Sequence, residues 1–369
     1  MLKRIYINNY RTFVNFEWRP PPVCVLVGPN GSGKSALMEV LCLLQDLVVA
    51  GKRLEDSGFP STLTVWREEV EQTIEVDIEL KGEEFRYRVT CRKDNGSSSI
   101  SEELLGNGDI LYRSGPEGAE IFGDQPGSAA RSKLQIPATP RTSFLASLET
   151  RTAYQRILRF REYLGSIWYL KPDPLRLGGA AVSEAPWLER NLTNFASWYR
   201  ERVQEDPDAV GALRNDLERA LHGFDQIRLQ SLPGGMKDIL VRFRFGGNAH
   251  ELHWGQLSDG QRMLIALYGV YRLAFPRAGL VALDEIENFV APAEIQPWLR
   301  EVVDIVTANN HQLIVVSHHP ESINYLAADS IWHMWRDHDT GHTRIAPLQP
   351  DREAGEAAYE ATKAEAVNA

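Results

Sequence analysis

The chain has 369 residues, of which 43% are hydrophobic and 24% charged, and its formal net charge is −10. This composition is that of a globular protein and excludes a disordered or fibrous chain, while the length allows a large core or two coupled lobes. The negative charge argues against broad, nonspecific coating of nucleic acid, although it leaves room for a local basic face.

The sequence has no recognisable membrane or export segment. The longest apolar runs, such as Leu313–Val316, are far shorter than the roughly 20 residues that span a bilayer, and the first residues lack an apolar signal core. Cys24, Cys42 and Cys91 form no Cys-x-x-Cys pair, which favours reduced thiols over disulfides or zinc. We therefore expect a cytoplasmic protein with no membrane partner.

The first 150 residues predict strands and one helix. Alternating apolar and polar residues from Leu2 to Phe13 predict a half-exposed edge strand, and the apolar run at 23–28 predicts a buried parallel strand. Helical spacing of apolar residues from Ser35 predicts a helix that ends at Gly51. Three later segments, TIEVDIEL, EFRYRVTC and DILYRS, alternate between glycine-rich turns, which predicts an antiparallel subdomain.

The rest of the chain predicts an inserted helical lobe and a second set of strands. Helical periodicity between Thr150 and Phe224 is interrupted at SIWYLKPDP, where a short strand meets two prolines. DQIRLQSL and ILVRFRFGG are expected strands, and GLVALDE and QLIVVSHH are expected buried parallel strands. The predicted domains are an N-terminal lobe (1–150), a helical insertion (151–224), a C-terminal lobe (225–350) and a flexible tail (351–369).

Residues 28–35, GPNGSGKS, fit the pattern G-x-x-x-x-G-K-[ST] between the buried strand and the helix. Such a loop turns its backbone N–H groups and the helix N-terminus toward phosphate oxygens. Lys34 is expected to contact the β- and γ-phosphates and Ser35 to ligate Mg²⁺. The other residues expected to bind the nucleotide here are Asn30, Gly31, Ser32 and Gly33. The alternative is a glycine-rich turn without a ligand, which the flanking strand and helix disfavour.

Two carboxylates and a histidine follow the two predicted parallel strands. Asp284 is expected to hold Mg²⁺ through water, and Glu285 to orient and deprotonate the attacking water. His318 is a candidate contact to the γ-phosphate, with a capped structural histidine as the alternative. His319 is interpreted as structural. An Asp-Glu pair after a strand is usually only the start of a loop, but the phosphate loop in the same chain favours the catalytic interpretation.

Together these segments resemble the Walker A, signature, Walker B and switch-histidine elements of ABC-type ATPase heads, with LSDGQR at 257–262 as the signature. Among ABC-type heads, the chain resembles the SMC/RecF/OLD-like group of AAA-labelled ATPases of DNA repair and phage defence. Chains of that group begin with a strand leading to N-[FY]-R-[ST]-F, and Asn9–Phe13 (NYRTF) matches this pattern. The resemblance implies an α/β ABC-type P-loop head with a mixed or parallel core sheet, an antiparallel β subdomain and a helical insertion. It also implies ATP and Mg²⁺ as cofactors.

The resemblance further implies a homodimer with composite ATP sites. Ser258 and Gly260 of one subunit would close over the γ-phosphate held by the phosphate loop of the other, with the helix beginning near Gln261 aimed at the phosphate. Arg11 and Thr12 match positions that approach the nucleotide, although a surface arginine is commonly only a solvated charge.

Some features depart from that family. Ile286-Glu287 and Val290-Ala291-Pro292 stand where the family often has Pro-Glu and Leu-His-Pro, so the resemblance does not extend to the cross-subunit role of that loop. Gln135 is not singled out as a Q-loop glutamine. Asp337 and Asp339 are interpreted as part of a loop, because too little chain follows to build a Toprim nuclease domain.

We therefore expect a Mg²⁺-dependent ATPase that dimerises around ATP and controls a DNA-linked process, such as phage defence, through a separate nuclease or toxin. Two alternatives stay open: a RecF-like repair ATPase that clamps DNA itself, and a nucleotide-gated scaffold with negligible hydrolysis. Glu285 favours turnover, because a protein that only binds has less use for a water-activating base.

Overall fold

The structure is a computed structural model, and it describes residues 1–94, 97–122, 133–136, 141–148, 154–318, 326 and 330–348. The chain forms two compact units, one from Met1–Ile167 with Asp329–Ala369 and the other from Trp168–Ala328. The predicted domain limits at residues 150, 224 and 350 stay predictions. The predicted tail, His319 and the side chain of Gln135 lie outside the described part of the chain.

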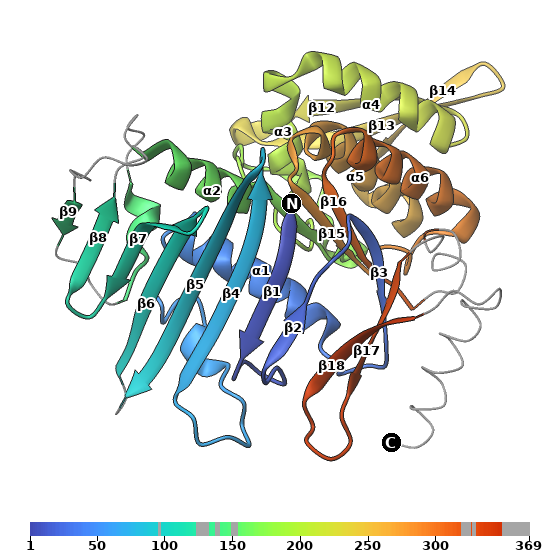
Figure 1. Cartoon of the computed structure of the whole chain (residues 1–369). Helices are drawn as coiled ribbons and strands as arrows, with labels where there is room; N and C mark the ends of the chain where they lie inside the picture. Colours follow the sequence, from blue (N-terminus) through green and yellow to red (C-terminus); the bar gives the residue numbers. More distant parts are fainter. Residues whose placement is uncertain are drawn as a thin grey trace. The chain divides into compact units, whose positions relative to one another are not determined.

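A large antiparallel sheet belongs to the first unit (Figure 1). Its strand order is β2-β1-β4-β5-β6-β7-β8-β9, and each neighbouring pair is antiparallel. One face of β5 is buried, with Phe85, Tyr87 and Val89 at most 1% exposed, because alternate residues of a strand point to the same side. This confirms the predicted antiparallel subdomain. The strands are β1 (Leu2–Asn8), β2 (Phe16–Trp18), β4 (Glu71–Leu80), β5 (Glu83–Asp94), β6 (Ser97–Gly106), β7 (Asp109–Gly115), β8 (Gly118–Phe122) and β9 (Lys133–Ile136).

The predicted edge strand is interior to this sheet. β1 pairs with β4 on one side and with β2 on the other, so that Ile5 lies opposite both Val76 and Trp18. The prediction of an edge position is therefore wrong. The prediction failed because β2 has only three residues, which are too few to show the alternating pattern of a strand.

The strand and helix that flank residues 28–35 are also in the first unit. β3 (Val23–Val27) pairs in parallel with β17 (Ile331–Arg336), and β17 pairs antiparallel with β18 (Thr343–Leu348). Helix α1 (Lys34–Val48) follows the loop and buries a stripe of leucines that recur three or four residues apart. This unit also contains α2 (Gln155–Gly165) and the short 3-10 helices η1 (Phe59–Ser61) and η2 (Phe144–Ser147).

The second unit contains the other predicted parallel pair. β15 (Leu280–Asp284) and β16 (Gln312–Val316) run in parallel and are buried along their whole length, in the order β10-β15-β16 with β10 (Ile167–Leu170). A smaller antiparallel sheet has the order β11-β13-β12, and β14 also pairs with β13. Its strands are β11 (Ala180–Ala181), β12 (Phe224–Ser231), β13 (Lys237–Phe245) and β14 (Asn248–His253).

Four longer helices complete the description of the second unit. They are α3 (Phe195–Glu205), α4 (Pro207–Ala220), α5 (Asp259–Leu273) and α6 (Pro292–Ala308). The short helices are η4 (Pro174–Arg176), η5 (Pro233–Gly235), η6 (Trp254–Gln256) and η7 (Phe275–Arg277). Among the described residues of both units, no helix is both long enough and apolar enough to cross a bilayer.

Candidate functional site

The loop at residues 28–35 has a backbone that glycine makes possible. Gly28 has a φ of +148°, and a Cβ atom there would lie 2.0 Å from the carbonyl oxygen of Met334. Gly33 has a φ of +110°, and a Cβ atom there would lie 3.0 Å from Oγ1 of Thr343. Both positions therefore need glycine, for conformation and for space.

The first turn of α1 suits an anion. Its N-cap, Gly33, contributes no side-chain cap, and the first turn contains no acidic residue, so no carboxylate there offsets the positive end of the helix dipole. Lys34 is 6% exposed, and its Nζ donates to the carbonyl oxygens of Gly28 (2.6 Å) and Pro29 (3.0 Å). Ser32 Oγ is buried without a hydrogen-bond partner among the described residues, and Ser35 is half-buried. The loop thus fits a polyphosphate.

A pair of threonines joins this loop to the start of the chain. Thr343 Oγ1 donates to the carbonyl oxygen of Ser32 (2.9 Å) and lies 2.7 Å from Oγ1 of Thr12. The N–H of Thr343 donates to the carbonyl oxygen of Thr12 (2.9 Å). The side chain of Thr343 therefore bridges Thr12 and the phosphate loop.

Arg11 forms an ion pair with the helix that follows the loop. Its Nη2 lies 2.6 Å from Oε2 of Glu39 on α1, and its side chain is 44% exposed. Its backbone has a φ of +51° and its N–H donates to the carbonyl oxygen of Thr62 (2.6 Å). The guanidinium is thus held near α1 but stays accessible to solvent.

Asp284, at the end of β15, is a buried carboxylate with two donors that the sequence did not indicate. Its side chain is 0% exposed. Its Oδ2 accepts hydrogen bonds from the hydroxyl of Tyr169 (2.8 Å) and from Nζ of Lys171 (3.1 Å). A buried carboxylate needs such partners to stay ionised. The short strand at 167–170 was predicted, but no local pattern indicates that Tyr169 and Lys171 contact Asp284, which lies 115 and 113 residues later.

Glu285 and His318 come together where β15 and β16 end. His318 Nε2 lies 3.6 Å from Oε1 of Glu285, and each side chain is 32% exposed. Asn288 Nδ2 donates to Oε2 of Glu285 (3.1 Å), and the Glu285 N–H donates to the carbonyl oxygen of Val316 (2.9 Å). Glu285 has a φ of +53°, an uncommon conformation that often marks functional positions. A solvent-accessible carboxylate oriented in this way can act as a general base.

The turn after Glu285 is tied to the end of β16. The hydroxyl of buried Ser317 donates to Oε1 of Glu287, which is 9% exposed. Because Ser317 precedes His318 and Glu287 follows Glu285 by two residues, this bond fixes the two strand ends relative to each other. Neither residue was predicted as part of the site.

Ser258 is exposed and is the N-cap of α5. Its Oγ accepts from the N–H of Gln261 (3.2 Å), and the Gln261 side chain accepts from the Ser258 N–H (3.0 Å), which is a capping box. A Cβ atom at Gly260 would lie 3.3 Å from the carbonyl oxygen of Phe289. The helix begins at Asp259, two residues earlier than predicted, and presents its N-terminus to solvent.

The contact between Lys171 and Asp284 is expected to contribute to the free energy of unfolding. Lys171→Met removes the cationic partner of a carboxylate that is 0% exposed, whereas the control Lys52→Met removes the partner of Asp46, which is 28% exposed. Since Lys171 is itself 46% exposed, we expect a loss of about 1–2 kcal/mol in the free energy of unfolding, against less than about 1 kcal/mol for the control. Urea unfolding of both variants measures the difference, and equal losses would contradict the interpretation.

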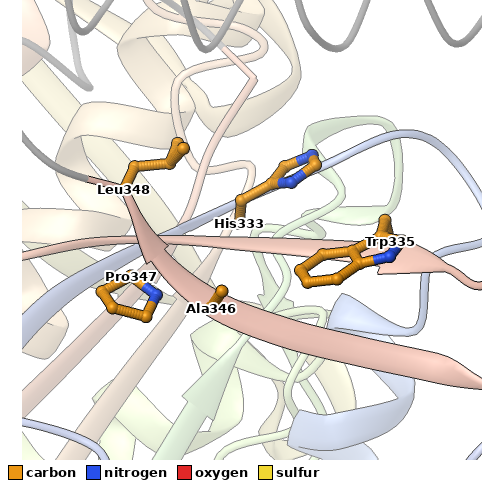
Figure 2. A pocket seen from close by; sticks show the side chains of 5 residues that line it. All are labelled: His333, Trp335, Ala346, Pro347 and Leu348. Atoms are coloured by element: carbon orange, nitrogen blue, oxygen red, sulfur yellow. The ribbon is translucent and has the colours of Figure 1, made fainter.

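A hollow of about 320 Å³ lies along β17 and β18 (Figure 2). His333 and Trp335, from alternate positions of β17, stack with ring centroids 5.5 Å apart. Its other lining residues are Ala346, Pro347 and Leu348. No residue predicted from the sequence to bind nucleotide or metal lines this hollow.

Comparison with known families identifies the sequence. A profile described as "AAA domain, putative AbiEii toxin, Type IV TA system" matches residues 23–324, a range that includes residues 28–35, Asp284, Glu285 and His318. No curated protein matches the chain.

Solved structures of SMC heads have a similar fold. The "SmcHead bound to the C-winged helix domain of ScpA" matches with a TM-score of 0.57 at 15% identity, covering 95% of this chain and 99% of the other. The "Smc head domain with an extended coiled coil bound to the C-terminal domain of ScpA derived from Pyrococcus furiosus" matches with a TM-score of 0.50 at 14% identity, covering 100% and 99%. The predicted α/β ABC-type fold, with a mixed parallel sheet and an antiparallel β subdomain, is confirmed.

Proposed function

Because the chain belongs to this AAA-domain family of P-loop ATPases, whose description names the AbiEii toxin and a Type IV TA system, we propose that it is a Mg²⁺-dependent ATP hydrolase that dimerises around ATP. The observation that carries the proposal is the loop at 28–35, with its uncapped helix N-terminus and with Lys34 bonded to two loop carbonyls. Each of these features would contribute to binding the phosphates of ATP.

The phosphates of ATP would be bound by the backbone of Asn30–Gly33 and by Lys34. Ser35 and Asp284 would hold Mg²⁺, which supplies positive charge that neutralises the phosphate oxygens when bound. The buried position of Asp284 supports this role, because a carboxylate in a low-dielectric site attracts a cation more strongly than one in water.

Glu285 would take the proton of the attacking water, and His318 would contact the γ-phosphate. Their separation of 3.6 Å and their partial exposure support the pairing, since a base must reach both water and the reacting group. Asn288 donates to the second oxygen of Glu285 and so limits its rotation. This oriented carboxylate supports hydrolysis over binding alone.

Ser258 and Gly260 would act on the nucleotide of a second copy. The exposure of Ser258 at the N-terminus of α5 supports this role, because a helix N-terminus attracts phosphate. Arg11 and Thr12 would approach the nucleotide held by their own chain, which the bond chain from Thr12 through Thr343 to Ser32 supports.

We propose that ATP-driven closure controls a separate effector protein in a defence process that involves DNA. The toxin system in the family description supports an effector, and the two SMC heads of similar fold are each bound to a part of ScpA. Direct DNA clamping in the manner of RecF is the second candidate. A toxin or nuclease gene next to the gene for this chain would favour a separate effector over direct DNA clamping.

Replacing Lys34 tests the phosphate site. Lys34→Ala should weaken ATP binding about 10- to 100-fold, because it removes a charge-assisted contact to the phosphates. Calorimetry with Mg²⁺-ATP measures the affinity, Lys52→Ala after the same helix is the matched control, and the thermal unfolding curve checks the fold. Unchanged affinity in a folded Lys34→Ala protein would remove the phosphate-loop assignment.

A further inference from the structure

The first unit carries an exposed tryptophan beside a histidine and an arginine. Trp66 lies in the loop between η1 and β4 and is 47% exposed. Its ring is nearly parallel to that of His342, at 16° with 6.3 Å between centroids, and Cζ of Arg336 lies 5.4 Å from its centroid. An indole left this exposed, with 92% exposed Val65 next to it, suggests a surface that a ligand covers.

This aromatic surface is connected to the phosphate loop through Thr343, and to the helix that follows the loop through Arg11, which pairs with Glu39. His342 directly precedes Thr343, whose Oγ1 donates to the carbonyl oxygen of Ser32 (2.9 Å), and neighbouring Cα atoms are only about 3.8 Å apart. From the other side, Thr62 at the start of the Trp66 loop accepts from the N–H of Arg11 (2.6 Å). The surface and the loop therefore belong to one hydrogen-bonded network.

The chemistry of the surface suits a flat aromatic ligand. Burial, and then the nearby charges of Arg344 and Arg67, lower the pKa of His342, which favours the neutral ring. The Arg336 guanidinium is fixed by donating from Nε to the carbonyl oxygen of Gly341 (3.1 Å). A fixed cation and two aromatic rings attract the π-face of a base.

We propose that Trp66, with His342 and Arg336, is the platform on which the base of the nucleotide stacks while residues 28–35 hold its phosphates. The proposal rests on the proposed ATP binding and adds to it the part of the ligand that Trp66 recognises. A protein built this way distinguishes a nucleotide from an inorganic polyphosphate. The nearly parallel His342 ring supports Trp66 in the orientation that stacking requires.

The test compares two ligands that share phosphates and differ in the base. Binding of ADP and of inorganic tripolyphosphate, each with Mg²⁺, is measured by calorimetry for the full chain and for Trp66→Ala, Trp66→Phe and Trp187→Ala. Trp187 is a matched control, since it is another exposed tryptophan (70%) in the second unit. We expect Trp66→Ala to weaken ADP binding roughly 10-fold and tripolyphosphate binding less than twofold. Trp66→Phe should recover most of the loss, and Trp187→Ala should bind both ligands normally.

Equal affinity of Trp66→Ala and the unmodified chain for ADP would overturn the platform, as would an equal loss for both ligands. Weaker binding of single-stranded DNA with unchanged ADP binding would also overturn it and would reassign Trp66 to nucleic acid. An unmodified chain that bound neither ADP nor tripolyphosphate would instead contradict the proposed ATPase itself, so the two failures are distinguishable. Quenching of tryptophan fluorescence by ADP that is lost in Trp66→Ala, and that tripolyphosphate does not produce, provides an independent readout.

Discussion

Replacing Glu285 with glutamine should slow ATP hydrolysis about 10²-fold or more while ATP still binds. The substitution keeps the shape and the contact with Asn288, but the amide cannot accept the proton of the attacking water, and general bases contribute about 10²- to 10⁴-fold. Asn288 donates to Oε2 of Glu285 (3.1 Å), and His318 Nε2 lies 3.6 Å from Oε1, so both carboxylate oxygens have a neighbour that limits their movement. Loss of basicity, not loss of position, is therefore the effect that the variant isolates.

Phosphate release and ATP affinity, measured side by side, check this expectation. Glu251→Gln is a suitable control, because Glu251 is a partly exposed carboxylate of β14 paired with Arg228, in the same unit. The control should hydrolyse ATP like the unmodified chain. Turnover by Glu285→Gln at the unmodified rate would show that another group activates the water.

Much of the fold could be predicted from the sequence because its elements have strong periodicity. The apolar runs of β3, β15 and β16 indicate buried parallel strands, and the alternation in β4 and β5 indicates an antiparallel sheet. The neighbours of β1 could not be predicted, because strand pairing depends on segments far apart and β2 has only three residues. Local sequence patterns therefore predict which segments form strands, whereas the order of the strands in a sheet depends on contacts between distant segments.

The same limit applies to the candidate site. The motif at 28–35 and the acids after β15 are local, so the sequence alone indicates them. Tyr169 and Lys171 bond to a carboxylate 115 and 113 residues away, and Thr343 bonds to Ser32 across 311 residues. No spacing rule predicts such contacts, and each becomes visible only once the strands are assembled.

Ser258→Arg should abolish ATP-dependent dimerisation and hydrolysis while leaving ATP bound to the chain's own phosphate loop. The side chain would place bulk and positive charge at the exposed N-terminus of α5, where a second copy must close. The variant also loses an N-cap, which costs about 1 kcal/mol, so its unfolding is measured alongside. Asn248→Arg, an exposed position on β14 of the same unit, controls for an added arginine and should dimerise normally.

Mixing Ser258→Arg with Lys34→Ala tests the central claim, that two copies share each ATP site. If the signature acts on the partner's nucleotide, a mixed dimer has one site with an intact phosphate loop facing an intact Ser258, and a second site with both lesions. We expect each variant to be inactive alone and the mixture to recover part of the ATPase activity, through one working site per mixed dimer. A mixture that stays inactive would contradict the shared-site mechanism, and so would a Ser258→Arg protein that closes and hydrolyses ATP normally on its own.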